Sequence, residues 1–316
     1  MQRREFIKLG ALGVAALVHE TAAAGDDAPS FKIGMAATTW LTAVPSTASY
    51  WNAVKDIAAL QIGATEADNG EAKLDSAYGK NPAIFRQKSR AAGVYLPGVF
   101  QALPLHDSGK MPQMRAKTTS VSRFLKAAGA QYIALGWDVP STPNGTAYQR
   151  TPDDVKHAII AMNEVGRVAQ GHGITIAFHA ERDIPKEIIL EVLDKTDPKY
   201  VHFCPDVGHL TATGLDPVQV VKKYSSRVAA SHWKDFDPKL PGPTYLGPSA
   251  TGDFVELGKG VVDFKALADL YHEIGFTGWV MLELDRTRYP SIQASAQAMK
   301  DYVTQTLKLR MYPRGR

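Results

Sequence analysis

The chain has 316 residues, of which 45% are hydrophobic and 22% are charged, and its formal net charge is +4. This is the balance of an ordinary globular protein, large enough to bury a core without disulfides, and the single cysteine, Cys204, excludes an internal disulfide. The basic residues are scattered, with no run of five or more Lys or Arg, which argues against a nucleic-acid-binding surface.

Residues 1–24 have the pattern of a twin-arginine export signal. Arg3 and Arg4 precede an apolar run at residues 9–18, and residues 22–24 are alanines that a signal peptidase could cut. The run is too short to span a bilayer as a helix. The alternative is an amphipathic N-terminal helix of a cytosolic protein. We predict export to the periplasm, with no stable membrane anchor once the signal is cleaved.

The rest of the chain is predicted to be one large domain at residues 31–310, preceded by a polar linker at 25–30 and followed by a short tail at 311–316. Within the domain, apolar runs alternate with segments whose apolar residues recur at helical spacing. The eight runs lie at residues 31–35, 61–65, 93–100, 132–137, 174–178, 201–204, 228–231 and 279–284.

Strands rich in Val and Ile, each followed by a helix, indicate a parallel sheet. Eight such units in roughly 280 residues favour a closed (β/α)8 TIM barrel over the alternative, an open doubly wound sheet. No Gly-x-Gly-x-x-Gly follows the first run, so a dinucleotide-binding domain has no local support. One long connection, at residues 235–276, is expected to shape or cover the active site, and its last part opens a helix at Asp263.

Polar residues at the carboxyl ends of barrel strands converge on one mouth. Here the last four runs each end in potential metal ligands or acid–base groups, which are His179 and Glu181, Asp206 and His209, His232 and Lys234, and Glu283 and Asp285. The separations from Glu181 to Asp206 and from Asp206 to His232 are 25 and 26 residues, about one strand–helix unit each.

Two or three carboxylates with one imidazole form a hard, mostly oxygen site for one divalent metal ion. Such a site suits Mn²⁺ best, and also accepts Mg²⁺, Co²⁺, Fe²⁺ or Zn²⁺. The absence of several cysteines argues against a structural zinc site.

Three motifs, Cys-Pro-Asp-Val-Gly-His at 204–209, Ser-His-Trp-Lys-Asp at 231–235 and Trp-Val-Met-Leu-Glu-Leu-Asp at 279–285, resemble the sugar phosphate isomerase/epimerase family. These are xylose isomerase-like barrels that include inosose dehydratases and ketose 3-epimerases, and the resemblance runs from about residue 32 to 307. It implies a metal held by ligands from strands five to eight, which are Glu181, Asp206, His232 and Glu283. It also implies that His209, Lys234 and Asp285 line the substrate site.

The fifth strand departs from the pattern of many relatives, which have His-Asn-His where this chain has His179-Ala180-Glu181. Residues two apart on a strand share a face, so either His179 or Glu181 can be the ligand while the other touches substrate. The resemblance to epimerases favours Glu181.

Further candidates are less specific. Glu66, after the second run, is predicted either to reach a sugar hydroxyl or to form a salt bridge at the rim, and His106 is predicted to contact substrate. The aromatic side chains of Trp40, Phe100 and Trp137 are predicted to form either an apolar wall against a sugar ring or part of the core.

The resemblance implies an isomerase or epimerase of a sugar or cyclitol, in which a bound metal stabilises the enediolate left when a proton next to a carbonyl is removed. Glu181 and Glu283 would exchange protons on the two faces of the substrate. The alternative is a lyase or dehydratase acting on a keto-sugar, keto-glycoside or inosose, with His179 or His209 as the acid for the leaving group.

The expected partner is a small carbohydrate or cyclitol, with no nucleic acid, and the sequence allows a homo-oligomer. Export argues against a phosphorylated substrate. Two further readings have less support: a metal-dependent endonuclease, and a periplasmic binding protein that has lost catalysis.

Overall fold

The computed structural model describes residues 31–43, 47–68, 81–140, 148–243, 246 and 250–315. The predicted export signal at 1–24 and the linker at 25–30 lie outside the described residues. No helix within the described ranges is long and apolar enough to cross a membrane.

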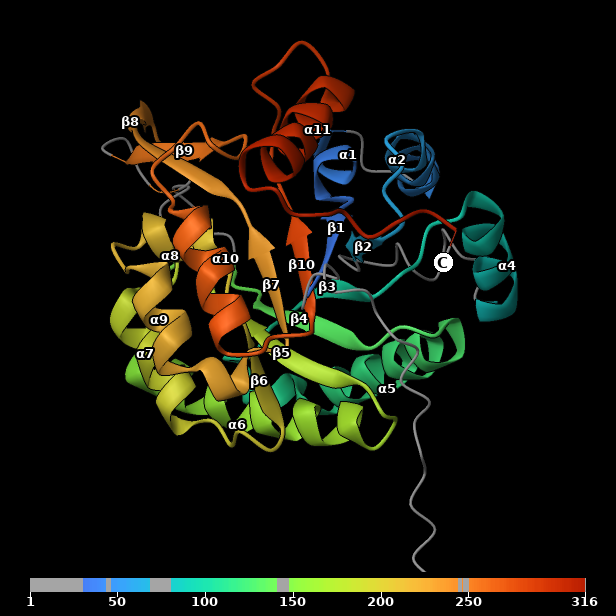
Figure 1. Cartoon of the computed structure of the whole chain (residues 1–316). Helices are drawn as coiled ribbons and strands as arrows, with labels where there is room; N and C mark the ends of the chain where they lie inside the picture. The colour runs from blue at the N-terminus through green and yellow to red at the C-terminus, as the bar shows by residue number, and fades with distance from the viewer. Residues whose placement is uncertain are drawn as a thin grey trace, which may run out of the picture.

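Eight parallel strands form the predicted TIM barrel (Figure 1). They are β1 (Lys32–Ala36), β2 (Thr65–Asp68), β3 (Gly98–Leu103), β4 (Tyr132–Trp137), β5 (Thr175–His179), β6 (Val201–Cys204), β7 (Ala230–Trp233) and β10 (Trp279–Leu282). β1 pairs with β2 and with β10, and β10 pairs with β7. Parallel bridges from Phe203 to Val228 and from Asp206 to His232 link β6 to β7 and bring the sheet close to full closure.

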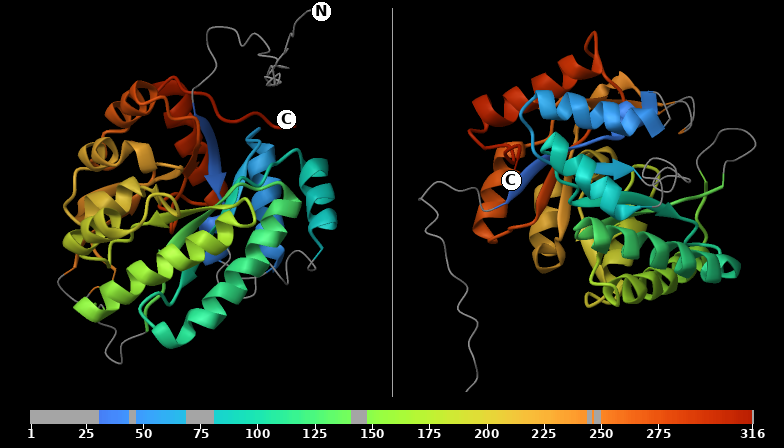
Figure 2. Two further views of the ribbon diagram at one scale, coloured as in Figure 1. Left: turned by 90° about the horizontal axis from the view of Figure 1, so that it is seen from below. Right: turned by 90° about the vertical axis from the view of Figure 1, so that its right-hand side faces the viewer.

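Helices surround the strands (Figure 2). The α-helices are α1 (Thr38–Ala43), α2 (Thr47–Ala59), α4 (Pro82–Ala92), α5 (Met111–Ala128), α6 (Pro152–Gln170), α7 (Lys186–Lys195), α8 (Val207–Ala212), α9 (Pro217–Lys223), α10 (Phe264–Glu273) and α11 (Ile292–Asp301). Short turns of other helix types lie at η1 (Ser108–Lys110), η2 (Ser225–Arg227) and η4 (Tyr302–Thr306). Asp263 caps α10 by accepting the backbone N–H of Ala266, so the predicted helix start is confirmed.

The strand period of two divides the core into two clusters. The larger cluster lies between the strands and the helices. The smaller one is built from alternate strand residues inside the barrel, where alanines combine with a few large side chains such as Tyr132, Trp279 and Met281. Cys204 belongs to this inner cluster and is a buried, free thiol.

The second and third strands begin later than the apolar runs at 61–65 and 93–100 predicted. β1 pairs with residues 65 and 66, so the ladder starts there. Ile62 and Ala64, before β2, are buried, but they make only single bridges, between Ala64 and Tyr95 and between Ile62 and Pro313. An apolar run therefore marks buried backbone, while the partner strand decides where regular pairing begins.

Residues 311–315, predicted as a short C-terminal tail, pack against the barrel. The backbone N–H of Tyr312 donates to Ile33 at 2.7 Å, and the N–H of Gly63 donates to Tyr312 at 2.7 Å. The Tyr312 ring packs edge-on against Trp279. The C-terminal segment thus covers the amino-terminal end of the strands, beside β1 (Figure 2).

The long connection after β7 contains an antiparallel hairpin, β8 (Asp235–Pro241) and β9 (Thr251–Val255). The buried Asp235 carboxylate holds its base by accepting four backbone N–H groups, from Phe236, Gly258, Gly260 and Val262, at 2.8–3.1 Å. The hairpin lies near the carboxyl ends of β7 and β10 (Figure 1), as a loop shaping the active site is expected to lie.

The close approach at Gly63 predicts a stability effect. A Cβ atom at this position would lie 2.0 Å from the backbone oxygen of Pro313, so Gly63→Ala must displace the C-terminal segment. We expect a loss of about 1–3 kcal/mol in the free energy of unfolding, measured with urea. Gly109→Ala is the control, because the nearest atom there is a side-chain oxygen of Asp107 at 3.2 Å. Equal stability of the two variants would contradict this account.

Candidate metal centre and active site

Four buried side chains from four strand ends form one compact donor cluster at the mouth of the barrel. It consists of His179, Asp206, His232 and Glu283, and one donor atom from each lies within 4.8 Å of all the others. His179 Nε2 lies 3.1 Å from His232 Nδ1 and 3.5 Å from Asp206 Oδ2. His232 Nδ1 lies 2.5 Å from Glu283 Oε2.

Asp206 has two roles, one for each carboxylate oxygen. Oδ1 accepts the backbone N–H of His209 at 2.9 Å and caps α8. Oδ2 lies 3.5 Å from His179 Nε2 and belongs to the cluster. Capping and metal binding, which are alternative explanations for an aspartate at a strand end, are therefore compatible in this residue.

The cluster fits a divalent cation. Asp206 Oδ2 and Glu283 Oε2 are buried and accept no hydrogen bond, which is costly for ionised oxygens. His179 Nε2 and His232 Nδ1 face each other and the two carboxylates. Two carboxylates balance the charge of one divalent ion, and two imidazoles with two carboxylates are a common ligand set for such ions.

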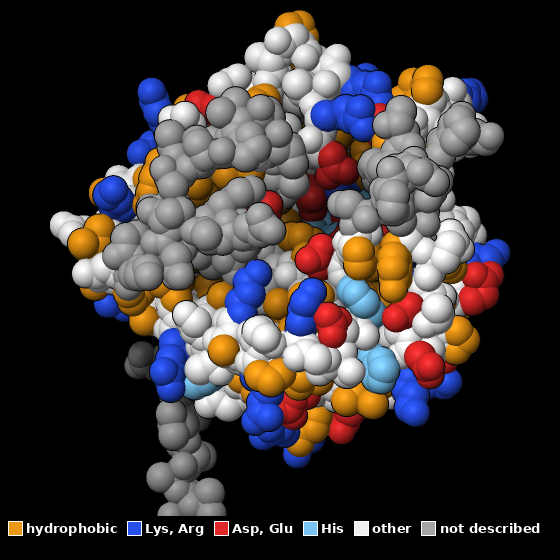
Figure 3. Space-filling view, turned by 180° about the vertical axis from the view of Figure 1, so that it is seen from behind, with side chains coloured by type: hydrophobic (Ala, Val, Ile, Leu, Met, Phe, Trp, Pro, Cys, Tyr) orange, Lys and Arg blue, Asp and Glu red, His pale blue; other side chains and the backbone are white. Residues whose placement is uncertain are grey.

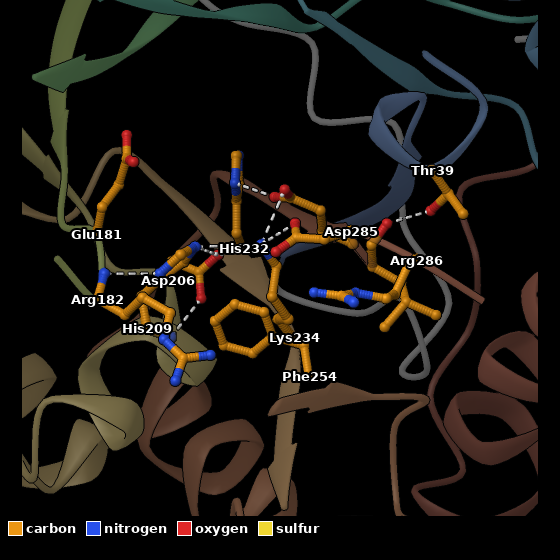
Figure 4. A network of polar contacts seen from close by, with 12 residues as sticks. Thr39, Glu181, Arg182, Asp206, His209, His232, Lys234, Phe254, Asp285 and Arg286 are labelled. Atoms are coloured by element: carbon orange, nitrogen blue, oxygen red, sulfur yellow. Dashed lines mark hydrogen bonds and ion pairs between the residues drawn. The ribbon is translucent and has the colours of Figure 1, made fainter. Parts of the chain in front are cut away.

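Glu181, the favoured ligand on the fifth strand, lies outside this cluster. β5 ends at His179, and the Glu181 side chain points away from Asp206 and His232 (Figure 4). Its carboxyl lies 3.9 Å from His179 Nδ1, and its side chain is 29% exposed. The structure thus places His179, the other candidate, among the donors.

Burial and then the nearby Asp183 raise the pKa of Glu181 to about 8, although Lys234 and Arg150 act in the opposite direction. The Glu181 carboxyl consequently keeps its proton at neutral pH.

The ammonium group of Lys234 lies close to three carboxylates of the site. Its buried ammonium lies 3.0 Å from Glu283 Oε1, 2.8 Å from Asp285 Oδ1 and 3.5 Å from Asp206 Oδ2. Burial alone would lower the pKa of Lys234, but these carboxylates hold it well above its ordinary value. Lys234 in turn keeps the pKa of Asp206 and Glu283 below the ordinary range despite their burial, so both are ionised and ready to bind a cation.

His209 lies beside this ammonium, with Nε2 3.2 Å from Lys234 Nζ. Its Nδ1 accepts the backbone N–H of Arg182 at 2.8 Å. Burial lowers the pKa of His209 well below its ordinary value, so the ring is neutral. The backbone N–H of Arg182 and the Lys234 ammonium are both donors, and the neutral ring can accept a hydrogen bond from only one of them at a time.

Glu66 was predicted to reach a sugar hydroxyl or to form a salt bridge, and His106 to contact substrate; the structure shows the protein contacts of both residues. Glu66 is 1% exposed inside the barrel, and its carboxylate contacts His232 and Tyr132. His106 is half-buried in the loop after β3, where its Nδ1 accepts the indole N–H of Trp137 at 3.4 Å.

The predicted aromatic residues have different surroundings. Phe100 packs edge-on against the ring of His179, with centroids 5.1 Å apart, and so forms one wall of the donor cluster. Trp40 is buried, and its indole N–H donates to Asp56. Trp137 is buried beneath the guanidinium of Arg150.

Two residues at the mouth were not predicted, Phe254 on β9 and Arg182 after β5. The Phe254 ring lies 4.7 Å from Lys234 Nζ and packs edge-on against His209. The Arg182 guanidinium stacks on Phe254 and on Phe236. Their position depends on the hairpin, which strand spacing does not reveal. In the space-filling view, acidic side chains gather in a hollow on one face of the molecule (Figure 3).

Comparison with known proteins identifies the fold family. The sequence model described as "Xylose isomerase-like TIM barrel" matches residues 57–303. The chain belongs to the xylose isomerase-like TIM barrel family. The family resemblance predicted from the last four strands is therefore confirmed.

Three relatives illustrate the range of this family. The chain is 22% identical to the inosose dehydratase of Geobacillus kaustophilus over 277 residues, covering 81% of this chain and 88% of the relative. A sugar phosphate isomerase/epimerase from Parabacteroides distasonis has a TM-score of 0.66 and 17% identity, covering 92% of this chain and 98% of that one. The IOLI protein with a bound zinc atom has a TM-score of 0.68 and 17% identity, covering 88% and 98%.

The geometry predicts which residue of the fifth strand binds the metal in this family member. We expect His179→Ala to weaken binding of Mn²⁺ or Zn²⁺ by more than roughly 100-fold, beyond the range for losing an outer contact. Glu181→Gln should change the dissociation constant by less than about tenfold, since its carboxyl lies outside the cluster. Competition with a chromophoric chelator measures both. The reverse order of effects would make Glu181 the ligand.

The raised pKa of Glu181 predicts a pH effect on stability. Its ordinary pKa is 4.5 and its folded pKa is about 8, so between these values the folded protein holds a proton that the unfolded chain has lost. Stability therefore falls as the pH rises through this window. Without metal, Glu181→Gln should be more stable than the natural protein above about pH 8, by at least about 1 kcal/mol, with a difference that shrinks toward pH 4.5.

Urea unfolding in the presence of a chelator, repeated across this pH range, measures the effect. Glu187→Gln on α7 is the matched control, because it makes the same substitution at an exposed glutamate. A Glu181→Gln difference that does not vary with pH would be inconsistent with a carboxyl that keeps its proton in the folded protein.

Proposed function

We propose that this protein is a divalent-metal-dependent lyase that eliminates water or an alcohol from a keto-sugar, keto-glycoside or inosose. The observation that carries the proposal is the contact between Lys234 and Asp285, with Nζ and Oδ1 2.8 Å apart beside the donor cluster. An elimination needs a base for the proton next to the carbonyl and an acid for the leaving oxygen. Asp285 and Lys234 supply such a pair.

A metal held by His179, Asp206, His232 and Glu283 would supply a Lewis acid that stabilises negative charge on the substrate carbonyl oxygen. The two imidazoles shift the expected metal from Mn²⁺ toward a wider set that includes Zn²⁺, Fe²⁺ and Co²⁺.

The proton transfers are assigned to this chain's own residues. The Asp285 carboxylate removes the proton next to the carbonyl, and burial raises the pKa of Asp285, which makes it a stronger base. The C–O bond at the neighbouring carbon breaks as the C=C bond forms, and the Lys234 ammonium protonates the departing oxygen. The proton then passes from Asp285 to Lys234 across their 2.8 Å contact, which restores both groups.

His209 supports the same reaction as a neutral imidazole. Its Nδ1 faces the backbone N–H of Arg182, and its Nε2 faces the Lys234 ammonium. A charged imidazolium would have to give up that backbone contact. We therefore assign His209 to orienting a substrate oxygen, and Lys234 to the acid role that the sequence had suggested for His179 or His209.

The second candidate is an isomerase or epimerase of a sugar or cyclitol, as the sequence first indicated. The likeness to a solved structure described as an isomerase/epimerase favours it. Epimerisation needs proton-transferring groups on opposite faces of the substrate. Glu181, intended for one face, lies outside the cluster, whereas Asp285 and Lys234 are adjacent and serve one face. This arrangement supports elimination more directly.

The predicted export signal fits a periplasmic enzyme acting on an unphosphorylated carbohydrate, because sugar phosphates are mostly found in the cytoplasm. This localisation is part of the proposal.

The decisive experiment incubates metal-loaded protein in D₂O with inososes, 3-keto-glycosides, keto-sugars and free sugars. We expect loss of water or of the aglycone and formation of an unsaturated ketone. At saturating metal, Lys234→Met should lower turnover by roughly 10²–10⁴-fold, the usual effect of losing an acid–base group. Lys239→Met is the control, because Lys239 is an exposed lysine on β8.

Deuterium uptake without loss of a leaving group would favour the isomerase or epimerase instead. Full turnover by Lys234→Met would show that Lys234 is not the acid of the reaction.

A further inference from the structure

Glu66 contacts the donor cluster from behind. It lies at the second residue of β2, across the barrel from His232 on β7, and both side chains are 1% exposed. Glu66 Oε1 lies 2.9 Å from Nε2 of His232, the ring nitrogen that faces away from the other donors. The opposite nitrogen, Nδ1, is the one near His179 and Glu283.

The second oxygen of Glu66 is also held. The hydroxyl of Tyr132, on β4, donates to Oε2 at 2.5 Å. The Tyr132 ring is wedged against Gly98, where a Cβ atom would lie 2.6 Å from it, so the hydroxyl has little freedom to move. Three strands on different sides of the barrel thus fix one carboxylate against one imidazole.

The chemistry of imidazole explains how the contact between Glu66 and His232 can support metal binding. A histidine binds a metal through a ring nitrogen that carries no proton, so its proton must be on the other nitrogen. When that nitrogen is buried it needs an acceptor, and a carboxylate acceptor orients the ring and makes the binding nitrogen more basic. In His232 the nitrogen directed at the cluster is Nδ1, so the proton belongs on Nε2, beside Glu66.

We propose that Glu66, held by Tyr132, is a positioning residue of the metal centre, which places its carboxylate charge against the Nε2 side of His232 and so keeps Nδ1 free for the cation. This inference rests on metal binding by the donor cluster, as proposed above. It assigns Glu66 to support of the metal rather than to the substrate contact that its place after a strand had suggested.

A second neighbour of the His232 ring is the thiol of Cys204, which is buried in the inner core. A neutral thiol is a weak acceptor and carries no charge. The two partners therefore make different predictions, and Cys204 provides a matched control inside the same inner core.

The test measures the dissociation constant for Zn²⁺ or Mn²⁺ by competition with a chromophoric chelator. Glu66→Gln removes the charge but keeps the shape, and should weaken binding by roughly 10–100-fold, the range for losing an outer carboxylate partner. Tyr132→Phe should weaken it in the same direction by a smaller factor. Cys204→Ala should stay within about twofold of the natural protein, since it leaves the carboxylate in place.

Two additional measurements separate positioning from general damage. Urea unfolding without metal reports the stability of each variant, and the visible absorption of bound Co²⁺ reports the ligand field. We expect Glu66→Gln to change the Co²⁺ spectrum and Cys204→Ala to leave it unchanged.

Metal affinity of Glu66→Gln within twofold of the natural protein would overturn the inference, as would an equal loss in Cys204→Ala. If Glu66→Gln fails to fold, an unchanged affinity in Tyr132→Phe overturns it. If the natural protein itself binds no divalent metal, the metal centre and this inference both fall. Tight binding by the natural protein with an unaffected Glu66→Gln rejects only the inference.

Discussion

The site depends on a balance of charge in a space that excludes water. Asp206 and Glu283 are buried, ionised carboxylates that share the Lys234 ammonium. Burying an unpaired charge costs far more than folding can supply, so such groups are retained only with partners. Lys234 also contacts Asp285, so its ammonium offsets one of three carboxylate charges, and a divalent cation among the donors would balance the other two. The same balance keeps both carboxylates deprotonated at neutral pH, which metal binding requires.

The amino-terminal end of the barrel contributes to stability, whereas the carboxyl end carries the candidate site. At the amino-terminal end, the C-terminal segment bonds to β1 through Tyr312 and packs on Trp279, which stabilises the fold. At the carboxyl end, the strand ends carry the donors, and loops complete the site. The hairpin of β8 and β9 belongs to this second group, because its base is held by the buried Asp235 and its Phe254 closes over Lys234. Stability and chemistry are thus separated along the barrel axis.

The contacts around His232 show how the barrel interior can serve the mouth. Cys204 and Tyr132 line the inner core, where packing alone would account for them. A carboxylate such as Glu66 is costly in an apolar interior unless it has partners. Glu66 lies between the Tyr132 hydroxyl and the His232 ring, which are its partners. The inner core therefore orients a donor as well as filling space, and polar residues there are tied to the site above them.

The sequence alone determined the fold class and most of the donors. Alternating apolar runs and helical segments predicted the eight-stranded barrel, and Asp206, His232 and Glu283 were found because strand ends recur at a regular spacing and converge in a closed barrel. Tertiary structure decided what this periodicity leaves open. His179 and Glu181 share a strand face by spacing, and only the end of β5 at His179 separated them.

Contacts across the barrel were equally beyond the sequence, because the pairing of Glu66 with His232 joins residues that lie 166 positions apart and on strands that are not neighbours. Local patterns specify which way a side chain faces, whereas only the closed barrel specifies what it meets there.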